Sequence, residues 1–245
     1  MLDKSPCLLE LSPGVLIFAT SMDALIMGVV ALCALLAVLA YTSQSQTGAI
    51  SFGLAAGLSA GAALYLSYGA PLLLAPAGAS AIALLRQRRF AIIAAMLAGV
   101  GMVVGVFTGA GFWILDGLEL TRAAYQAGIS TRRPAGLFFW LNLGALTAMI
   151  GPMPLAGVAA WLQQHRWRPT HSPLGGIVAM TLVGVLAANL SGLSKGEVER
   201  IWLPFVPVLT LAAAPLAASR TVARTALGLQ LAVAVGLQIV WRSPW

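Results

Sequence analysis

Long apolar runs separated by short polar turns repeat along the whole chain. A helix that crosses a membrane needs about 20 mostly apolar residues, and by that measure the sequence predicts eight spans. The second and third are separated only by the turn signal at residues 68–71, so we interpret the third as a span or as a short re-entrant helix. The eight are Met22 to Tyr41, Ala49 to Tyr68, Pro71 to Leu85, Phe90 to Leu115, Ala135 to Leu162, Leu174 to Leu190, Trp202 to Ala218 and Thr225 to Trp241.

The composition gives the same picture. Of the 245 residues 60% are hydrophobic and 9% are charged, whereas about 25% of the residues of a typical soluble domain are charged. We therefore expect an all-α, polytopic bundle of transmembrane helices in the cell membrane, with residues 1–245 as one domain. The net charge of +7 lies in short arginine clusters between apolar runs, which is typical of a membrane protein and speaks against nucleic acid as a partner.

The arginine clusters also predict an orientation. Three loops carry only positive charge, and with eight spans all three fall on one face, which the positive-inside rule makes cytoplasmic. Every acid then falls on the opposite, outer face, together with both termini. The basic residues are Arg86, Arg88 and Arg89, then Arg166 and Arg168, then Arg220 and Arg224; the acids are Asp3, Glu10, Asp23, Asp116, Glu119, Glu197 and Glu199.

Glycines recur every four residues in two of the predicted spans. Gly53, Gly57 and Gly61 lie in the second span, and Gly101, Gly105 and Gly109 lie in the fourth. Small residues at this spacing allow helix backbones to approach closely. We therefore predict that both stripes are packing surfaces.

The segment Ser191 to Phe205 is the first candidate for a functional site. It carries Lys195, Glu197, Glu199 and Arg200 between two uncharged apolar runs, and charges beside membrane spans need an aqueous edge or a polar cavity. The alternative is a solvated loop whose charges satisfy one another, with Trp202 as an interfacial anchor.

A second polar segment, Asp116 to Pro134, carries the cations Arg122, Arg132 and Arg133. Part of it has an amphipathic pattern and predicts a helix along the membrane surface. Arginine binds phosphate oxygens in a bidentate manner, so this segment suits a lipid phosphate or a lipid-linked pyrophosphate. Contact with ordinary phospholipid head groups is the alternative.

We predict that these two segments fold together into one polar pocket. Carboxylates near the head-group boundary are costly unless they are paired, so Glu197 or Glu199 is expected to pair with Arg122, Arg132 or Arg133. Asp23, at the edge of the first span, is expected to need an arginine of the outer loops as its partner. The alternative is a polar helix start, with Ser21 or Asp23 as the cap. Asn142 and Asn189 lie inside spans and are expected to hydrogen bond between helices.

Three strings carry a resemblance to a known family. They are TSMDALIMGVVAL (Thr20 to Leu32), GFWILDGLELTRAAYQAGISTRRP (Gly111 to Pro134) and SGLSKGEVERIWLPF (Ser191 to Phe205). Together they resemble the later membrane half of actinobacterial multi-pass proteins related to the GT-C superfamily of glycosyltransferases. The resemblance implies a polyprenyl-phosphate sugar as donor and a site at the extracytoplasmic face. It also implies a catalytic acid in an early outer loop, which this sequence lacks. We therefore expect the later part of a longer chain, with an N-terminal half or a partner subunit that supplies the rest.

The leading hypothesis is a membrane glycosyltransferase-like protein. Transfer needs a carboxylate that takes the acceptor's proton and cations, or a divalent metal ion, that stabilise the leaving phosphate. The alternatives are a component of a transporter or lipid flippase and a non-catalytic membrane scaffold. The candidate bases are Glu197, Glu199 and Asp116, and the candidate substrate-binding residues are Arg122, Arg132, Arg133, Lys195, Arg200 and Asp23.

Overall fold

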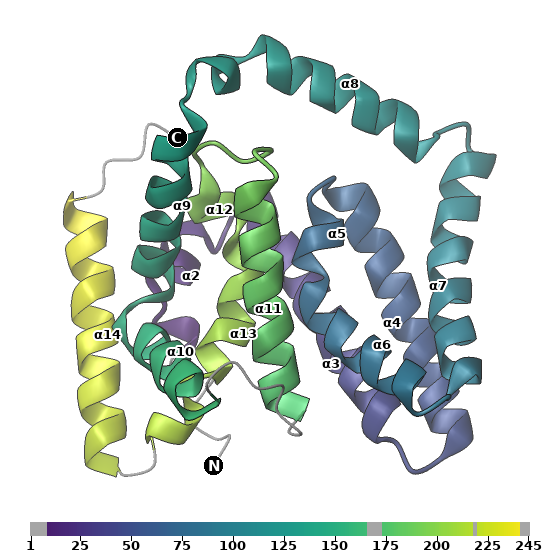
Figure 1. Ribbon diagram of the computed structural model, residues 1–245, viewed down its shortest axis with the longest axis horizontal. Helices are drawn as coiled ribbons and strands as arrows, with labels where there is room; N and C mark the ends of the chain where they lie inside the picture. Colours follow the sequence, from purple (N-terminus) through teal and green to yellow (C-terminus); the bar gives the residue numbers. More distant parts are fainter. Residues whose placement is uncertain (1–8, 166–172, 218–219, 241–245) are drawn as a thin grey trace.

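The computed structural model describes residues 9–165, 173–217 and 220–240, and these residues form helices joined by short turns, with no strand among them (Figure 1). The all-α fold class predicted from the sequence is confirmed. In chain order the elements are α2 (Pro13–Phe18), α3 (Met22–Thr42), α4 (Gln46–Leu66), α5 (Ala70–Leu73), α6 (Ala75–Arg86), α7 (Phe90–Gly109), α8 (Ile114–Ala127), η2 (Ile129–Arg132), α9 (Ala135–Ile150), α10 (Pro152–His165), α11 (Pro173–Leu190), α12 (Val198–Ile201), η3 (Leu203–Phe205), α13 (Val206–Leu211), η4 (Ala214–Ala217) and α14 (Arg220–Val240).

Four of the described helices, α3, α4, α7 and α14, are long and apolar enough to cross a membrane. The bent pair α9 and α10 brings the number to five if it counts as one span, and α11 is a shorter apolar helix. The structure thus has four or five candidate spans where the sequence pattern predicts eight. The third predicted span is the short alternative, because α5 and α6 replace it with helices of 4 and 12 residues.

The fifth predicted span is not one straight helix. Helices α9 and α10 meet at Gly151 with a bend of 112°. Gly151 has a φ of +80°, which favours glycine, and Pro152 has no backbone N–H to continue the hydrogen bonds of α9. The run of apolar residues is therefore a bent pair of helices, which is either a broken span or a re-entrant loop.

The seventh predicted span is not one continuous helix either. Between Val198 and Ala217 the chain forms α12, η3, α13 and η4, short pieces that Pro204 and Pro207 help to separate. These pieces are the centre of the largest apolar core: Trp202 is 1% exposed and Phe205 is 0% exposed. Trp202 is therefore a core residue and not an interfacial anchor.

The glycine stripes divide into one packed and one open stripe. A Cβ at Gly57 would overlap the backbone of Met96 in α7, and a Cβ at Gly99 would lie 2.6 Å from the nitrogen of Leu58 in α4. The first stripe is thus confirmed as a packing surface. The second is wrong, because a Cβ at Gly101, Gly105 or Gly109 meets no atom within 4 Å.

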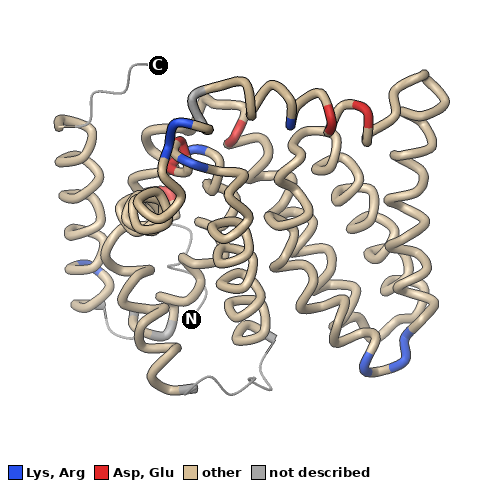
Figure 2. Tube along the Cα trace, turned by 45° about the horizontal axis from the view of Figure 1, so that its top comes forward, with Lys and Arg blue, Asp and Glu red and all other residues tan. Residues whose placement is uncertain are grey.

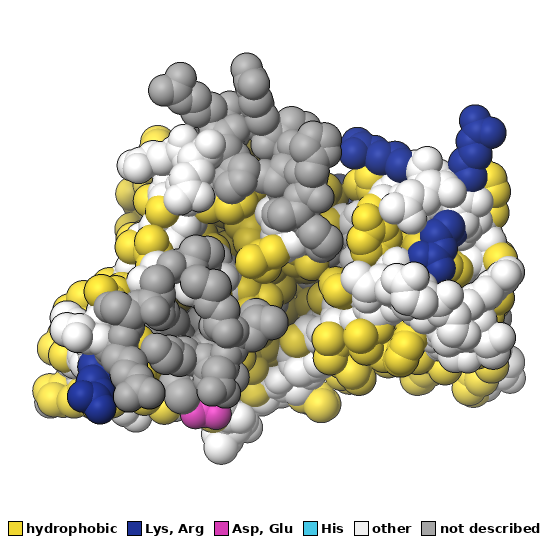
Figure 3. All heavy atoms as spheres, turned by 90° about the horizontal axis from the view of Figure 1, so that it is seen from below, with side chains coloured by type: hydrophobic (Ala, Val, Ile, Leu, Met, Phe, Trp, Pro, Cys, Tyr) yellow, Lys and Arg dark blue, Asp and Glu magenta, His cyan; other side chains and the backbone are white. Residues whose placement is uncertain are grey.

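The molecule has two ends that differ in charge. Helix α3 has 21 residues and is about 31 Å long. Near its start, Asp23 contacts Arg200, and near its end the carbonyl of Tyr41 accepts a hydrogen bond from Arg89. We call these the α8 end and the Arg86–Arg89 end. Figure 2 shows red and blue positions together along the α8 end and blue ones alone at the turn between α6 and α7. Figure 3 shows the face seen from below, where dark blue side chains are scattered over a largely yellow and white surface and a magenta side chain lies near the edge.

The acids follow the predicted sorting with one exception. Asp23, Asp116, Glu119, Glu197 and Glu199 belong to the α8 end. Glu10 does not: it lies two residues before Ser12, whose hydroxyl donates to the carbonyl of Met149 near the far end of α9. Asp3, Arg166 and Arg168 lie outside the described residues.

The first prediction concerns orientation. Gln87 at the Arg86–Arg89 end and Gly128 at the α8 end are both exposed and lie at opposite ends of the molecule (Figure 1). In a chain whose two native cysteines are replaced, an impermeant maleimide added outside the cell is expected to label a cysteine at position 128 and not one at position 87. Labelling of both positions from the same side would contradict this orientation.

Candidate functional site

Helix α8 lies across one end of the molecule as a strap (Figure 1). None of its 14 residues is buried, so the predicted helix is present and lies on the outside of the protein. Near its start, Gly117 lies so close to the hydroxyl of Tyr68 and the ring of Phe112 that a Cβ would not fit. Near its end, Tyr125 contacts the segment that follows α11. The strap therefore joins two parts of the chain that are far apart in sequence.

Two hydrogen bonds of the Tyr125 hydroxyl join α8 to the loop at residues 191–197. The hydroxyl donates to the carbonyl of Gly192 at 3.4 Å and accepts from the backbone N–H of Lys195 at 3.0 Å. Arg133, just beyond η2, donates to the carbonyl of Lys195, and its guanidinium lies 5.3 Å from the ring centre of Phe138. The predicted meeting of the two polar segments is confirmed.

A buried pair of asparagines supports this loop from below. The amide of Asn142 donates to Asn189 at 3.1 Å and to the carbonyl of Ser194 at 2.7 Å, and its oxygen accepts from Gly196 at 3.4 Å. The expected hydrogen bond between helices is therefore present, and it also fixes the loop. Gly196 has a φ of +93° and lies directly against the Arg133 guanidinium, so the loop turns sharply at this point.

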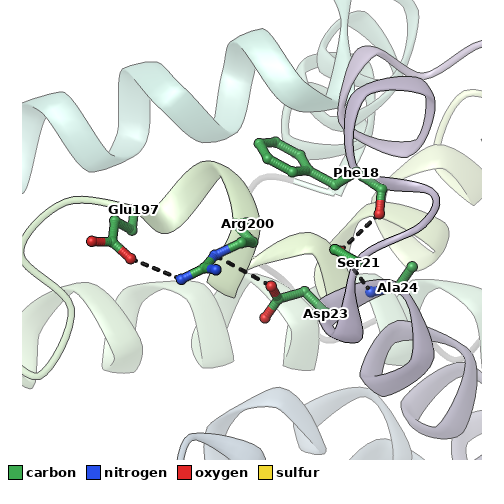
Figure 4. A network of polar contacts seen from close by, with 6 residues as sticks. All are labelled: Phe18, Ser21, Asp23, Ala24, Glu197 and Arg200. Atoms are coloured by element: carbon green, nitrogen blue, oxygen red, sulfur yellow. Dashed lines mark hydrogen bonds and ion pairs between the residues drawn. The ribbon is translucent and has the colours of Figure 1, made fainter. Parts of the chain in front are cut away.

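The charges of the loop pair differently from the prediction. Arg200 lies between two carboxylates, with Asp23 at 3.3 Å and Glu197 at 2.8 Å (Figure 4). Among the described residues, neither Glu197 nor Glu199 forms an ion pair with Arg122, Arg132 or Arg133. The reason is local: Glu197 and Arg200 are three residues apart on α12 and its N-cap, so they meet without any help from the tertiary fold. Asp23 does find the arginine that it was expected to need.

The start of α3 is capped as expected. The Ser21 side chain accepts a hydrogen bond from the N–H of Ala24 at 3.3 Å and donates to the carbonyl of Phe18 at 2.8 Å. Both alternatives for this helix start therefore hold: Ser21 caps the helix, and Asp23 is free to pair with Arg200.

A cavity of about 240 Å³ lies between α8 and the loop. Two cations and three hydroxyl groups line it, and no carboxylate among the described residues is part of its wall. We call it the cationic pocket. It is lined by Arg122, Tyr125, Gln126, Thr131, Ser191, Gly192, Leu193 and Lys195.

Of the substrate-binding residues predicted from the sequence, Arg122 and Lys195 line the cationic pocket. Arg133 and Arg200 instead hold the loop and α12 in place, and Arg132 is exposed outside the pocket wall. None of the candidate bases, Glu197, Glu199 and Asp116, lines the pocket. Gln126, Thr131 and Ser191 also line the pocket and were not predicted, although the spacing of Arg122 and Gln126 by one helical turn could have indicated a shared face.

No family model, curated protein or solved structure matches the chain. The chemistry of the pocket is therefore argued from its geometry. Arg122 and Lys195 supply the positive charge, and no group of three Cys, His, Asp or Glu side chains in the described part of the chain could hold a metal ion. Such a lining suits an anion with several oxygen acceptors, such as a phosphate.

Proposed function

We propose that this protein is a membrane glycosyltransferase-like protein of the cell membrane that holds the phosphate of a polyprenyl-phosphate sugar in the cationic pocket. The supporting observation is that Arg122 and Lys195 line the same cavity and that no carboxylate of the described residues lines it. A phosphate diester or monoester keeps its charge in such a setting, because charge-assisted hydrogen bonds favour the anion. The pocket lies at the same end of the molecule as the polar start of α3, so the phosphate would sit at head-group level.

The size of the pocket limits what it holds. Binding sites for drug-sized molecules have volumes of about 300–1,000 Å³, and this pocket has about 240 Å³. It suits a phosphate with part of its sugar, while the hydrocarbon chain stays among the membrane lipids. The exposed Leu193 on its wall is an apolar contact for such a chain.

A second candidate function is a non-catalytic scaffold that binds the same lipid. The observation in its favour is that none of Glu197, Glu199 and Asp116 lines the pocket. Turnover separates the two functions, because a scaffold binds the lipid phosphate and releases it unchanged.

The transporter alternative has less support. Transporters often place ion sites at broken helices, and the α9–α10 break is of that kind. Here, however, Ser12 donates to the carbonyl of Met149 and Gln230 donates to that of Ile150, each at 2.7 Å. These carbonyls therefore accept hydrogen bonds within the protein, which stabilises the bend and argues against an ion site there.

Phosphate binding gives the second prediction. In nanodiscs, polyprenyl phosphate is expected to raise the unfolding temperature of the protein and polyprenol is not. Arg122→Gln or Lys195→Gln is expected to weaken binding at least about tenfold, because a hydrogen bond to a charged group is worth about 1.5–3 kcal/mol. Arg86→Gln, an exposed cation at the opposite end, is the control and should change the affinity less than about twofold.

Two results would contradict this proposal. Equal stabilisation by polyprenol would show that the phosphate is not recognised. An equal loss of affinity for Arg132→Gln would show general attraction to head groups instead of a pocket, because Arg132 is outside the pocket wall.

A further inference from the structure

The backbone of the loop at residues 191–197 is held by side chains and not by regular secondary structure. Asn142 in α9 donates to the carbonyl of Ser194 at 2.7 Å and accepts from the N–H of Gly196 at 3.4 Å. Its amide thus bonds to the residues on both sides of Lys195. Backbone groups away from water need hydrogen-bond partners, so these two bonds fix the loop at the position of Lys195.

A second buried amide holds Asn142 in its orientation. Asn142 is 2% exposed in the apolar helix α9, and Asn189 of α11 is 7% exposed. The amide of Asn142 donates to Asn189 at 3.1 Å, and Asn189 in turn donates to the carbonyl of Phe139 at 3.1 Å. Burying an amide costs free energy unless its donors and acceptors are paired. The pairing of Asn189 therefore keeps the Asn142 amide turned toward the loop.

The loop brings Lys195 into the wall of the cationic pocket, where Arg122 lies on the α8 side. A lysine side chain is long and flexible, so a mobile backbone would add to the freedom that it loses when an anion binds. A cation that is already held in place loses less conformational entropy on binding. Asn142 itself does not line the pocket, so its effect on a bound anion has to pass through the loop.

We infer that Asn142 is a positioning residue of the cationic pocket, which holds Lys195 in the pocket wall together with Arg122; this rests on the proposed function. Asn142 acts on the backbone of the loop and does not touch the ligand. The buried amide pair thereby connects the packing of α9 against α11 to the affinity of the pocket for a phosphate group. Two asparagines inside apolar helices then have a role in binding as well as in packing.

Asn142→Leu tests this role, because leucine has a similar size and cannot hydrogen bond. The protein in nanodiscs is titrated with radiolabelled polyprenyl phosphate at a temperature at which every variant is folded. The substitution is expected to weaken binding at least about fivefold, since it removes the hydrogen bonds that fix the loop. Gln230→Met removes another buried amide, at the far end of α9, and is the control for a general loss of stability. It should change the affinity less than about twofold.

A double-mutant cycle separates positioning from a purely structural role. In the Lys195→Gln background, Asn142→Leu is expected to change the affinity less than about twofold, because the cation that it positions is gone. In the Arg122→Gln background the loss stays at least about fivefold, because Arg122 belongs to α8 and not to the loop. Equal further losses in the two backgrounds would overturn the positioning role, and so would wild-type affinity in Asn142→Leu or an equal loss in Gln230→Met. If Asn142→Leu does not fold, Asn142→Ser takes its place in the cycle, because its shorter side chain cannot make both bonds to the loop.

These outcomes separate the two proposals. If Arg122→Gln and Lys195→Gln weaken lipid-phosphate binding and Asn142→Leu does not, the phosphate site stands and only the positioning role is lost. If Arg122→Gln and Lys195→Gln leave that binding intact, the proposed function itself fails.

Discussion

Gly57→Leu is expected to separate α4 from α7 and to lower the stability of the protein by about 3 kcal/mol or more. A Cβ at Gly57 already overlaps the backbone oxygen of Met96 and lies 2.8 Å from its carbonyl carbon. Backbone atoms cannot rotate away as a side chain can, so the two helices have to move apart along their whole contact. That movement loses the van der Waals contact that drives the association of helices in lipid. The measurement is the unfolding temperature in detergent, compared with that of the wild type.

The chain supplies a matched control for this prediction. Gly105 lies in α7 at the same four-residue spacing, and a Cβ there meets no atom within 4 Å. Gly105→Leu is therefore expected to leave the unfolding temperature nearly unchanged, whereas Gly99→Leu should behave like Gly57→Leu because Gly99 faces the backbone of Leu54 and Leu58. Equal losses for Gly57→Leu and Gly105→Leu would contradict the close approach of α4 and α7.

The two glycine stripes show what a sequence pattern can and cannot predict. Spacing by four places residues on one face of a helix, but it does not say which way that face points. Gly57 faces α7, while Gly105 points outward. The long apolar runs likewise predicted helices correctly, because α3, α4, α7 and α14 follow directly from their length and composition.

The errors in the span count have a common physical origin. Apolar residues are as typical of a buried core as of a lipid-facing helix, so hydropathy alone cannot tell Trp202 in the core from a tryptophan at the membrane surface. Proline and glycine give the difference: Pro204 and Pro207 help to divide the seventh run, and Gly151 with Pro152 bends the fifth. Glycine alone does not break a span, because α4 and α7 each contain several glycines and stay continuous. A predicted span with two prolines inside it, or with glycine directly before proline, is better interpreted as a broken helix.

At the site, the sequence predicted which segments meet but not which side chains pair. The cost of an unpaired carboxylate correctly required a partner for Asp23, and Arg200 is that partner. Glu197, the N-cap of α12, pairs with the same arginine three residues further on, and not with an arginine across the pocket. The described wall of the cationic pocket therefore carries Arg122 and Lys195 and no carboxylate, which suits an anion as its ligand.

The bend between α9 and α10 depends on a side chain of another helix. Gln230 in α14 is 0% exposed, and its amide donates to the carbonyl of Ile150 at 2.7 Å. Its oxygen accepts from the N–H of Met153 at 3.5 Å. A helix end has carbonyls without partners inside the helix, and in an apolar interior a carbonyl left without a donor is costly.

Gln230→Met is therefore expected to lower the free energy of unfolding by about 1–3 kcal/mol, the cost of leaving the buried carbonyl of Ile150 unsatisfied. Methionine has a similar size and an apolar character, so the substitution removes the hydrogen bonds and largely keeps the packing. Gln238→Met, two turns further along α14 at an exposed position, is the control and should change the unfolding temperature little. Because the bend holds α10 at 112° to α9, Gln230→Met is also expected to increase the maleimide labelling of a cysteine placed at Met153. Unchanged labelling and unchanged stability would show that Gly151 and Pro152 hold the bend without the hydrogen bonds of Gln230.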